Sequence, residues 1–233
     1  MIRYIINANK FNVLGSLLLK PFILISFLFL IMGLIFTFYI SPSDYQQGSA
    51  VKIMYIHVPS AWLSLMTYFI MTIYSIIALF FKMQFGFIVN KAVAPIGAVF
   101  TLICIVTGSL WGKPMWGTWW VWDARLTSVA ILFIIYLIII FMNLSFENRI
   151  VREKVVAIFI LVGSVNLPIV KFSVDWWNTL HQPATISKLS KPSIDPSMMT
   201  PLIIMTFAFI MIGIAIAILR IKTEIISRKS YLS

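Results

Sequence analysis

Six apolar stretches, most of them long enough to cross a lipid bilayer, constrain this chain more than any other feature. They cover residues 21–40, 59–81, 92–110, 126–143, 155–170 and 201–219. About 20 helical residues cross roughly 30 Å of hydrocarbon at a rise of about 1.5 Å per residue. Only 11% of the 233 residues are charged, whereas a soluble domain carries about 25%. We therefore predict an all-α integral membrane protein with six transmembrane helices, forming one polytopic domain over residues 1–233.

The first and fifth stretches need separate comment. The first follows Arg3, Lys10 and Lys20 and superficially resembles a signal peptide, but its apolar part is too long and lacks a convincing cleavage site. We interpret it as an uncleaved span. The fifth is the shortest and contains Asn166 and Pro168, so it is the weakest of the six by length and composition.

Lysine and arginine predict the orientation of the chain in the membrane. Twelve of the eighteen lie in the N-terminal segment, the C-terminal tail and the loops after the second and fourth spans. Because cytoplasmic loops carry the excess of basic residues, both termini are predicted to be cytoplasmic. Residues 41–58, 111–125 and 171–200 then face outward. The net charge of +11 therefore reflects the orientation of the chain in the membrane, and it is compatible with contact to membrane lipid. Nucleic-acid binding is excluded.

Tryptophan gathers on the predicted outer side. Five of the eight tryptophans fall within residues 111–122, and none lies at the opposite interface. An interfacial aromatic belt is the alternative, although a belt would decorate both interfaces. If the segment is helical from Trp116, then Trp116, Trp119, Trp120 and Asp123 share one face. Together with Trp122, these indoles would form a flat apolar platform suited to a wide planar ligand.

Polar residues beside this platform could bind the edge of such a ligand. Arg125 and Lys113 could pair with carboxylates, and arginine can do so bidentately. Asp123 could orient Arg125 or a tryptophan N–H, and helix N-capping of the fourth span is the alternative. The single cysteine, Cys104, lies within an apolar run, where it is expected to be a small buried hydrophobe.

Both histidines of the chain flank the tryptophan segment. His57 precedes the second span and His181 precedes Pro183. Imidazole is a common axial ligand of haem iron, and two imidazoles can bind on opposite sides of one porphyrin. If residues 174–182 form a short helix, Trp177 lies beside His181 at i+4. The pattern predicts a haem site, with satisfied interfacial histidines as the alternative.

At this point the residues resemble a known family. The segment WGKPMWGTWWVWDARLTS (111–128) is similar to the tryptophan-rich WWD motif of haem-handling membrane proteins. YIHVPSAW, APIGAVFTL, NLPIVKFSVDWWNTLHQP and SIDPSM resemble segments of the cytochrome c maturation protein C family, also called haem exporter protein C. The resemblance extends from about Asp44 to Met198.

The resemblance implies a haem-transfer protein rather than an enzyme, which could promote covalent haem attachment to its partner. It implies b-type haem held at the periplasmic face, with His57 and His181 as axial iron ligands, and delivery to the haem chaperone CcmE. It further implies an ABC-type complex (CcmA and CcmB), a small subunit (CcmD), and a bacterial inner membrane, with the mitochondrial inner membrane as the alternative.

Two other function classes compete with this interpretation. A membrane redox enzyme would need a second cofactor within the bilayer, and a chain with two histidines in total offers no second ligand pair. A transporter conducting haem through the chain would favour discontinuous helices or polar groups at the midplane. Only Asn166 with Pro168 points in that direction.

Overall fold

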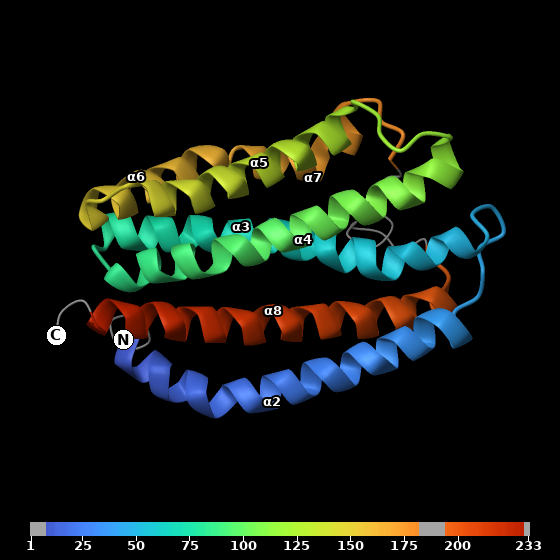
Figure 1. Ribbon diagram of the computed structural model, residues 1–233. Helices are drawn as coiled ribbons and strands as arrows, with labels where there is room; N and C mark the ends of the chain where they lie inside the picture. The colour runs from blue at the N-terminus through green and yellow to red at the C-terminus, as the bar shows by residue number, and fades with distance from the viewer. Residues whose placement is uncertain (1–7, 182–193, 231–233) are drawn as a thin grey trace.

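A computed structural model describes residues 8–181 and 194–230, and within these ranges the secondary structure is almost entirely helical (Figure 1). The α-helices are α2 (Ala8–Ile35), α3 (Met54–Phe80), α4 (Gln84–Trp116), α5 (Ala124–Ser145), α6 (Arg149–Gly163), α7 (Asn166–Trp176) and α8 (Pro196–Ser230). A π-helical turn at Phe36–Ile40 extends α2, and a 3₁₀ turn at Ser49–Ile53 leads into α3. Six segments of the described chain are long and apolar enough to cross a membrane. The predicted all-α, six-span fold class is confirmed.

Several helices extend well beyond the apolar runs that predict them. Helix α4 has 33 residues and α8 has 35, so each is roughly 50 Å long and exceeds the hydrocarbon thickness of about 30 Å. An apolar run stops at the first charged residues, but the helix continues through them into the polar interface. The ends of the helices therefore lie outside the hydrocarbon, where polar side chains can meet solvent or one another.

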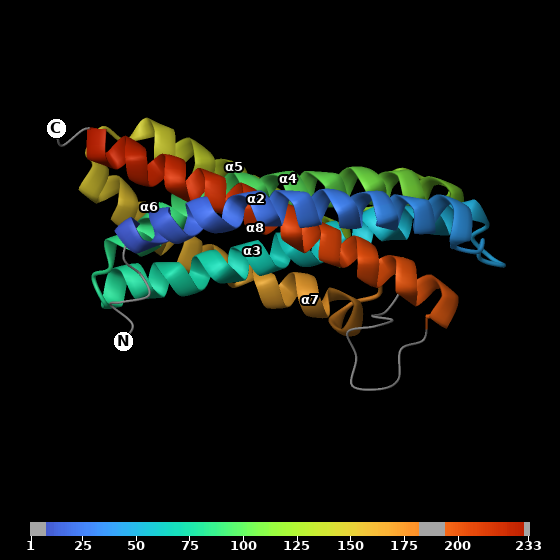
Figure 2. The same ribbon diagram turned by 90° about the horizontal axis from the view of Figure 1, so that it is seen from below.

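The helices pack in pairs that place both termini at one end of the bundle. Figure 1 shows α2 beside α8, α3 beside α4, and α5 with α6 and α7 on the far side of the α3–α4 pair. The start of α2 and the end of α8 share one end (Figures 1 and 2). The loops predicted to face outward, where the structure describes them, lie at the opposite end, which we call the loop end.

Buried tyrosine hydroxyls tie the layers together. The Tyr136 hydroxyl in α5 donates to the Ser64 carbonyl in α3 at 2.7 Å, and the Tyr68 hydroxyl in α3 donates to the Ile160 carbonyl in α6 at 3.1 Å. Gly97 in α4 permits this packing, because a Cβ there would lie 2.2 Å from the Tyr136 ring. Small residues allow such close helix approach in membranes, where unpaired polar groups are costly.

The fifth span consists of two helices. Helix α6 ends at Gly163, α7 begins at Asn166, and the intervening backbone N–H groups bond within a tight turn. Pro168 has no N–H to donate to the Ser164 carbonyl, which removes one helical hydrogen bond at this position and favours a break. The Asn166 side chain is buried and donates to the Ser128 carbonyl in α5 at 2.9 Å.

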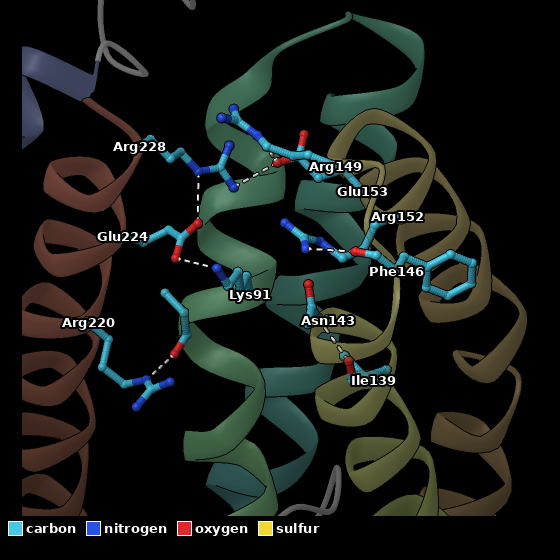
Figure 3. Close-up of polar contacts among 11 residues, drawn as sticks. Lys91, Ile139, Asn143, Phe146, Arg149, Arg152, Glu153, Arg220, Glu224 and Arg228 are labelled. Atoms are coloured by element: carbon cyan, nitrogen blue, oxygen red, sulfur yellow. Dashed lines mark hydrogen bonds and ion pairs between the residues drawn. The ribbon is translucent and has the colours of Figure 1, made fainter. Parts of the chain in front are cut away.

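A chain of ion pairs joins three helices at the end of the bundle that holds the termini (Figure 3). Glu224 of α8 pairs with Lys91 of α4 at 2.8 Å and with Arg228 at 2.9 Å. Arg228 pairs in turn with Glu153 of α6 at 2.9 Å, and Glu153 with Arg149 at 3.0 Å. Glu153 and Arg228 are buried. This end is therefore fixed by charge, whereas the tryptophan and histidine side chains lie at the loop end.

Candidate functional site

The loop end of the bundle contains a cavity of about 1110 Å³. Its walls come from the segment before α3 and from α3, α4, α5, α7 and the first turns of α8. Pockets for drug-sized ligands are typically about 300–1,000 Å³, so this cavity has room for a larger molecule. Of the predicted site residues, five line it, and these are His57, His181, Trp116, Trp120 and Arg125.

His57 lies in the first turn of α3, where α4 fixes its ring. Its Nδ1 is 3.1 Å from the Cys104 carbonyl oxygen and 3.2 Å from Thr107 Oγ1. Because a carbonyl can only accept, Nδ1 carries the proton and donates, and Nε2 retains the free lone pair. Gly108 makes room for the ring, since a Cβ there would lie 3.0 Å from His57 Cε1. The arrangement prepares Nε2 to act as a metal ligand.

His181 faces His57 although 124 positions separate them in the sequence. The two ring centroids are 6.4 Å apart and the rings are inclined by 35°. If two imidazoles bind one metal ion from opposite sides, two bonds of about 2 Å plus the radii of the two rings give roughly 6 Å between the ring centroids. The described residues hold no group of three or more His, Cys, Asp or Glu side chains that could surround a metal ion. The histidine pair is therefore the donor set that this cavity offers.

The short helix expected over 174–182 does not form over residues 177–181, and residue 182 lies outside the described part of the chain. Helix α7 ends at Trp176, and Trp177 is extended, with φ −134° and ψ 155°. Downstream, the Leu180 N–H donates to Asp123 Oδ2 at 3.2 Å instead of to a helical carbonyl. Trp177 consequently packs edge-on against Trp176, with ring centroids 5.7 Å apart, rather than lying one turn from His181. The expected i+4 stacking of Trp177 on His181 is wrong.

The tryptophan segment is also not helical beyond Trp116. Gly117 has φ 76° and ends α4 in the left-handed conformation that glycine adopts readily. The shared helical face expected for Trp116, Trp119, Trp120 and Asp123 is therefore wrong. Trp116 and Trp120 line the cavity, whereas the side chains of Trp119 and Trp122 are 54% and 79% exposed.

Asp123 caps a helix, as the alternative interpretation of the sequence held. Its Oδ1 accepts from the Leu126 N–H at 2.8 Å at the start of α5, and its Oδ2 accepts from Leu180. One carboxylate thus joins the start of α5 to the segment that carries His181. Lys113 lies outside the cavity lining: its Nζ donates to the Gly117 carbonyl at 3.0 Å and sits 5.8 Å from the centre of the Trp119 ring.

Two buried donors in the cavity wall have no hydrogen-bond partner within the described parts of the chain. They are Arg125 Nε and Trp120 Nε1, and both residues line the cavity. Buried donors are nearly always paired in native proteins, so an unpaired one calls for an explanation. A ligand carrying carboxylate groups would supply acceptors for both.

Sequence reasoning missed the residues that support His57. The Trp111 ring contacts it edge-on, with centroids 5.8 Å apart and planes at 79°, and Trp62 also lines the cavity. Trp111 Nε1 donates to Gln47 Oε1 at 2.9 Å. A usable signal was present, because helical i, i+3, i+4 and i+7 spacing puts four residues on one face of α4, namely Cys104, Thr107, Gly108 and Trp111.

Comparison with known proteins agrees with this architecture. The family profile described as "Heme exporter protein C" matches residues 1–232. The heme exporter protein C of Bradyrhizobium diazoefficiens is 47% identical over 82% of this chain and 72% of its own length. That of Haemophilus influenzae is 44% identical over 94% and 88%, and that of Escherichia coli K12 is 45% identical over 84% and 79%. The chain belongs to the heme exporter protein C family.

Proposed function

We propose that this protein holds haem in the cavity at the loop end and passes it to the haem chaperone CcmE for maturation of c-type cytochromes. The observation that carries the proposal is the pair of imidazoles facing each other across 6.4 Å at one cavity. Relatives named heme exporter protein C support the haem cargo. The cargo supplies an iron centre with two open axial positions and two carboxylate side groups.

His57 and His181 are the proposed axial ligands. The Cys104 carbonyl accepts a hydrogen bond from the Nδ1–H group of His57. This hydrogen bond leaves Nε2 available as a ligand and makes Nε2 more basic. His181 stands on the short segment held by Asp123, so the pair is assembled from two parts of the chain that are fixed independently. Separation of the two sides offers a route to release: the ligand on the segment after α7 can withdraw while His57, in α3, stays hydrogen-bonded to α4.

Arg125 and Trp120 are proposed to bind the carboxylates of the haem. Both residues line the cavity and carry a buried donor without a hydrogen-bond partner among the described residues, and the guanidinium of arginine suits a carboxylate. Trp116 contributes an apolar wall. Three further tryptophans, Trp119, Trp122 and Trp177, are at least half exposed. In this proposal they border the haem once the partner has docked.

Orientation and partners belong to the same proposal. The excess of Lys and Arg at the end that holds the termini supports a cytoplasmic position for that end, and hence a periplasmic haem site in a bacterial inner membrane. A protein without its own nucleotide-binding motif would work beside the ABC-type subunits CcmA and CcmB and the small subunit CcmD.

The test is the absorption spectrum of haem bound to the purified full-length protein. His57→Ala and His181→Ala are each expected to lose the low-spin bands of bis-imidazole haem. Tyr39→Ala is the matched control, because Tyr39 is an aromatic residue near the loop end that is 86% exposed. Unchanged low-spin bands in either histidine variant would refute the ligand assignment. Loss of those bands in Tyr39→Ala would show that the assay reports general damage.

Conduction of haem through the helices is the second candidate, favoured by the break between α6 and α7. The Asn166 amide at this break is buried and donates to the Ser128 carbonyl, which gives the break a packing role. Movement of haem across liposomes containing only this chain would favour conduction. Retention of haem on one side would favour holding.

A further inference from the structure

The segment between α2 and α3 contains a well-formed turn at Asp44–Gly48, to which the sequence assigned no role. Asp44 Oδ1 accepts from the backbone N–H of Gln46 at 2.9 Å and of Gln47 at 2.8 Å. Asp44 and Gly48 also exchange backbone hydrogen bonds of 3.1 and 2.9 Å. Gly48 has φ 56°, a conformation that glycine adopts at little cost. We call this segment the Asp44 turn.

The chain on both sides of the Asp44 turn is anchored to the helices. Ser41 Oγ and the Tyr55 hydroxyl share a buried hydrogen bond. Lys52 Nζ donates to the Phe38 carbonyl at 3.0 Å. These contacts join the end of α2 to the start of α3, so the turn holds a defined position beside the cavity.

The Asp44 turn presents one side chain to α4. Gln47 Oε1 accepts from Trp111 Nε1 at 2.9 Å across 64 positions of sequence. Trp111 in turn places its ring edge-on to His57, at 5.8 Å and 79°. On its Nδ1 side, His57 is held by Cys104 and Thr107. The imidazole is therefore confined from two directions, by a hydrogen bond along its plane and by an indole against it.

We propose that Gln47 is a positioning residue for the His57 ligand, acting through Trp111; this inference rests on the proposed function. An indole whose N–H is bound keeps one rotamer. An indole released from Gln47 can turn, and His57 then loses a wall that sets the orientation of its ring. The orientation of an axial imidazole affects the electronic structure of low-spin haem. Spectroscopy can therefore distinguish a role of Gln47 in orienting His57 from a role that only anchors the Asp44 turn to α4.

The experiment compares three glutamine variants of the full-length protein loaded with haem. Gln47→Met keeps the length of the side chain and removes the acceptor, whereas Gln47→Glu keeps an acceptor. Gln46→Met is the matched control, since Gln46 is the exposed neighbour in the same turn. Electron paramagnetic resonance of the ferric protein and the rate of haem loss to apomyoglobin are measured.

We expect Gln47→Met to shift the low-spin g-values and to speed haem loss roughly two- to tenfold, which is the range for one hydrogen bond. Gln47→Glu should restore both values toward wild type, and Gln46→Met should match wild type. Wild-type g-values together with a wild-type rate of haem loss in Gln47→Met would overturn the proposal.

A second variant tests the route through the indole. Trp111→Phe removes the donor, so it should reproduce the spectral shift of Gln47→Met, and the double variant should add little. If Gln47 acted by touching haem directly, the two effects would instead add, and that result would also overturn the proposal. Failure of the proposed function looks different: low-spin haem would then persist in His57→Ala whatever stands at position 47.

Discussion

Gly108→Ala separates the support of His57 from the stability of its helix. A Cβ at this position would lie 3.0 Å from Cε1 and 3.5 Å from Nδ1 of His57. Carbon atoms in favourable contact are about 3.5–4.0 Å apart, so the ring must retreat by roughly 0.5 Å. The Nδ1 distance to the Cys104 carbonyl is 3.1 Å, and retreat away from α4 would lengthen it to about 3.6 Å, beyond hydrogen-bonding range.

Loss of a hydrogen bond behind a metal ligand typically lowers affinity by about 10- to 100-fold. The same substitution favours the helix, because alanine is more stable than glycine in a helix interior by up to about 1 kcal/mol. We therefore expect Gly108→Ala to weaken haem binding at least about tenfold, while the melting temperature of the haem-free protein stays level or rises.

Absorption titration with haem in detergent measures the affinity, and circular dichroism measures the melting temperature. Gly213→Ala in α8 is the matched control, because its Cβ would meet Phe100 at an ordinary 3.5 Å. If Gly108→Ala bound haem as tightly as Gly213→Ala, the inference that the α4 backbone fixes the His57 ring would be refuted.

Substitutions at three further positions test other parts of the account. Arg125→Gln should weaken haem binding roughly tenfold or more but leave binding of haem dimethyl ester unchanged; equal losses in the same titration would argue against a carboxylate contact. Asp123→Ala should lower the free energy of unfolding by about 1 kcal/mol in denaturant melts, and Asp123→Asn, which still caps, by less. Glu153→Gln removes the carboxylate that pairs with Arg149 and Arg228, although Arg228 keeps its ion pair with Glu224 (Figure 3). The substitution should destabilise the protein by roughly 1–3 kcal/mol without altering the haem spectrum.

Sequence predicted the fold well because lipid leaves few options. Apolar runs of bilayer length must be helical, and this is why six spans could be identified without any tertiary information. The ends of the helices were less predictable, since the polar interface tolerates continuation of a helix as well as its end. The break before Asn166 was indicated in the sequence only by Asn166 and Pro168, and the missing N–H of proline removes one helical hydrogen bond. Prolines elsewhere in the chain, such as Pro95, lie inside unbroken helices.

Within the site, the sequence predicted which residues lie on the same side of the membrane, but it did not predict the distances and contacts between them. His57 and His181 were expected at the same side, and the structure adds their separation of 6.4 Å. The helix expected beyond Trp116 rested on residue spacing, and Gly117 acts there as a stop signal. The helix expected over 174–182 also rested on spacing, but the Leu180 N–H bonds to Asp123 instead of to a helical carbonyl. Contacts such as Leu180 to Asp123 join distant segments, and no local pattern encodes them.

The pairing of Gln47 with Trp111 shows the same limit. Asp44 and Gly48 are residue types common in turns, but nothing nearby in the sequence indicates that Gln47 meets an indole 64 positions away. The role of the turn emerges only when α4 is placed beside α3. Supporting residues of this kind act through contacts between distant segments, so local sequence patterns do not reveal them.

The central claim is that two histidines of this chain bind one haem iron. The most direct measurement is pulsed electron paramagnetic resonance on ferric haem bound to protein in which only histidine carries nitrogen-15. Because the chain has two histidines, the account predicts a low-spin signal with strong hyperfine coupling to two labelled nitrogens bound directly to the iron, one from each imidazole. Strong coupling to one directly bound labelled nitrogen, or to none, would contradict it.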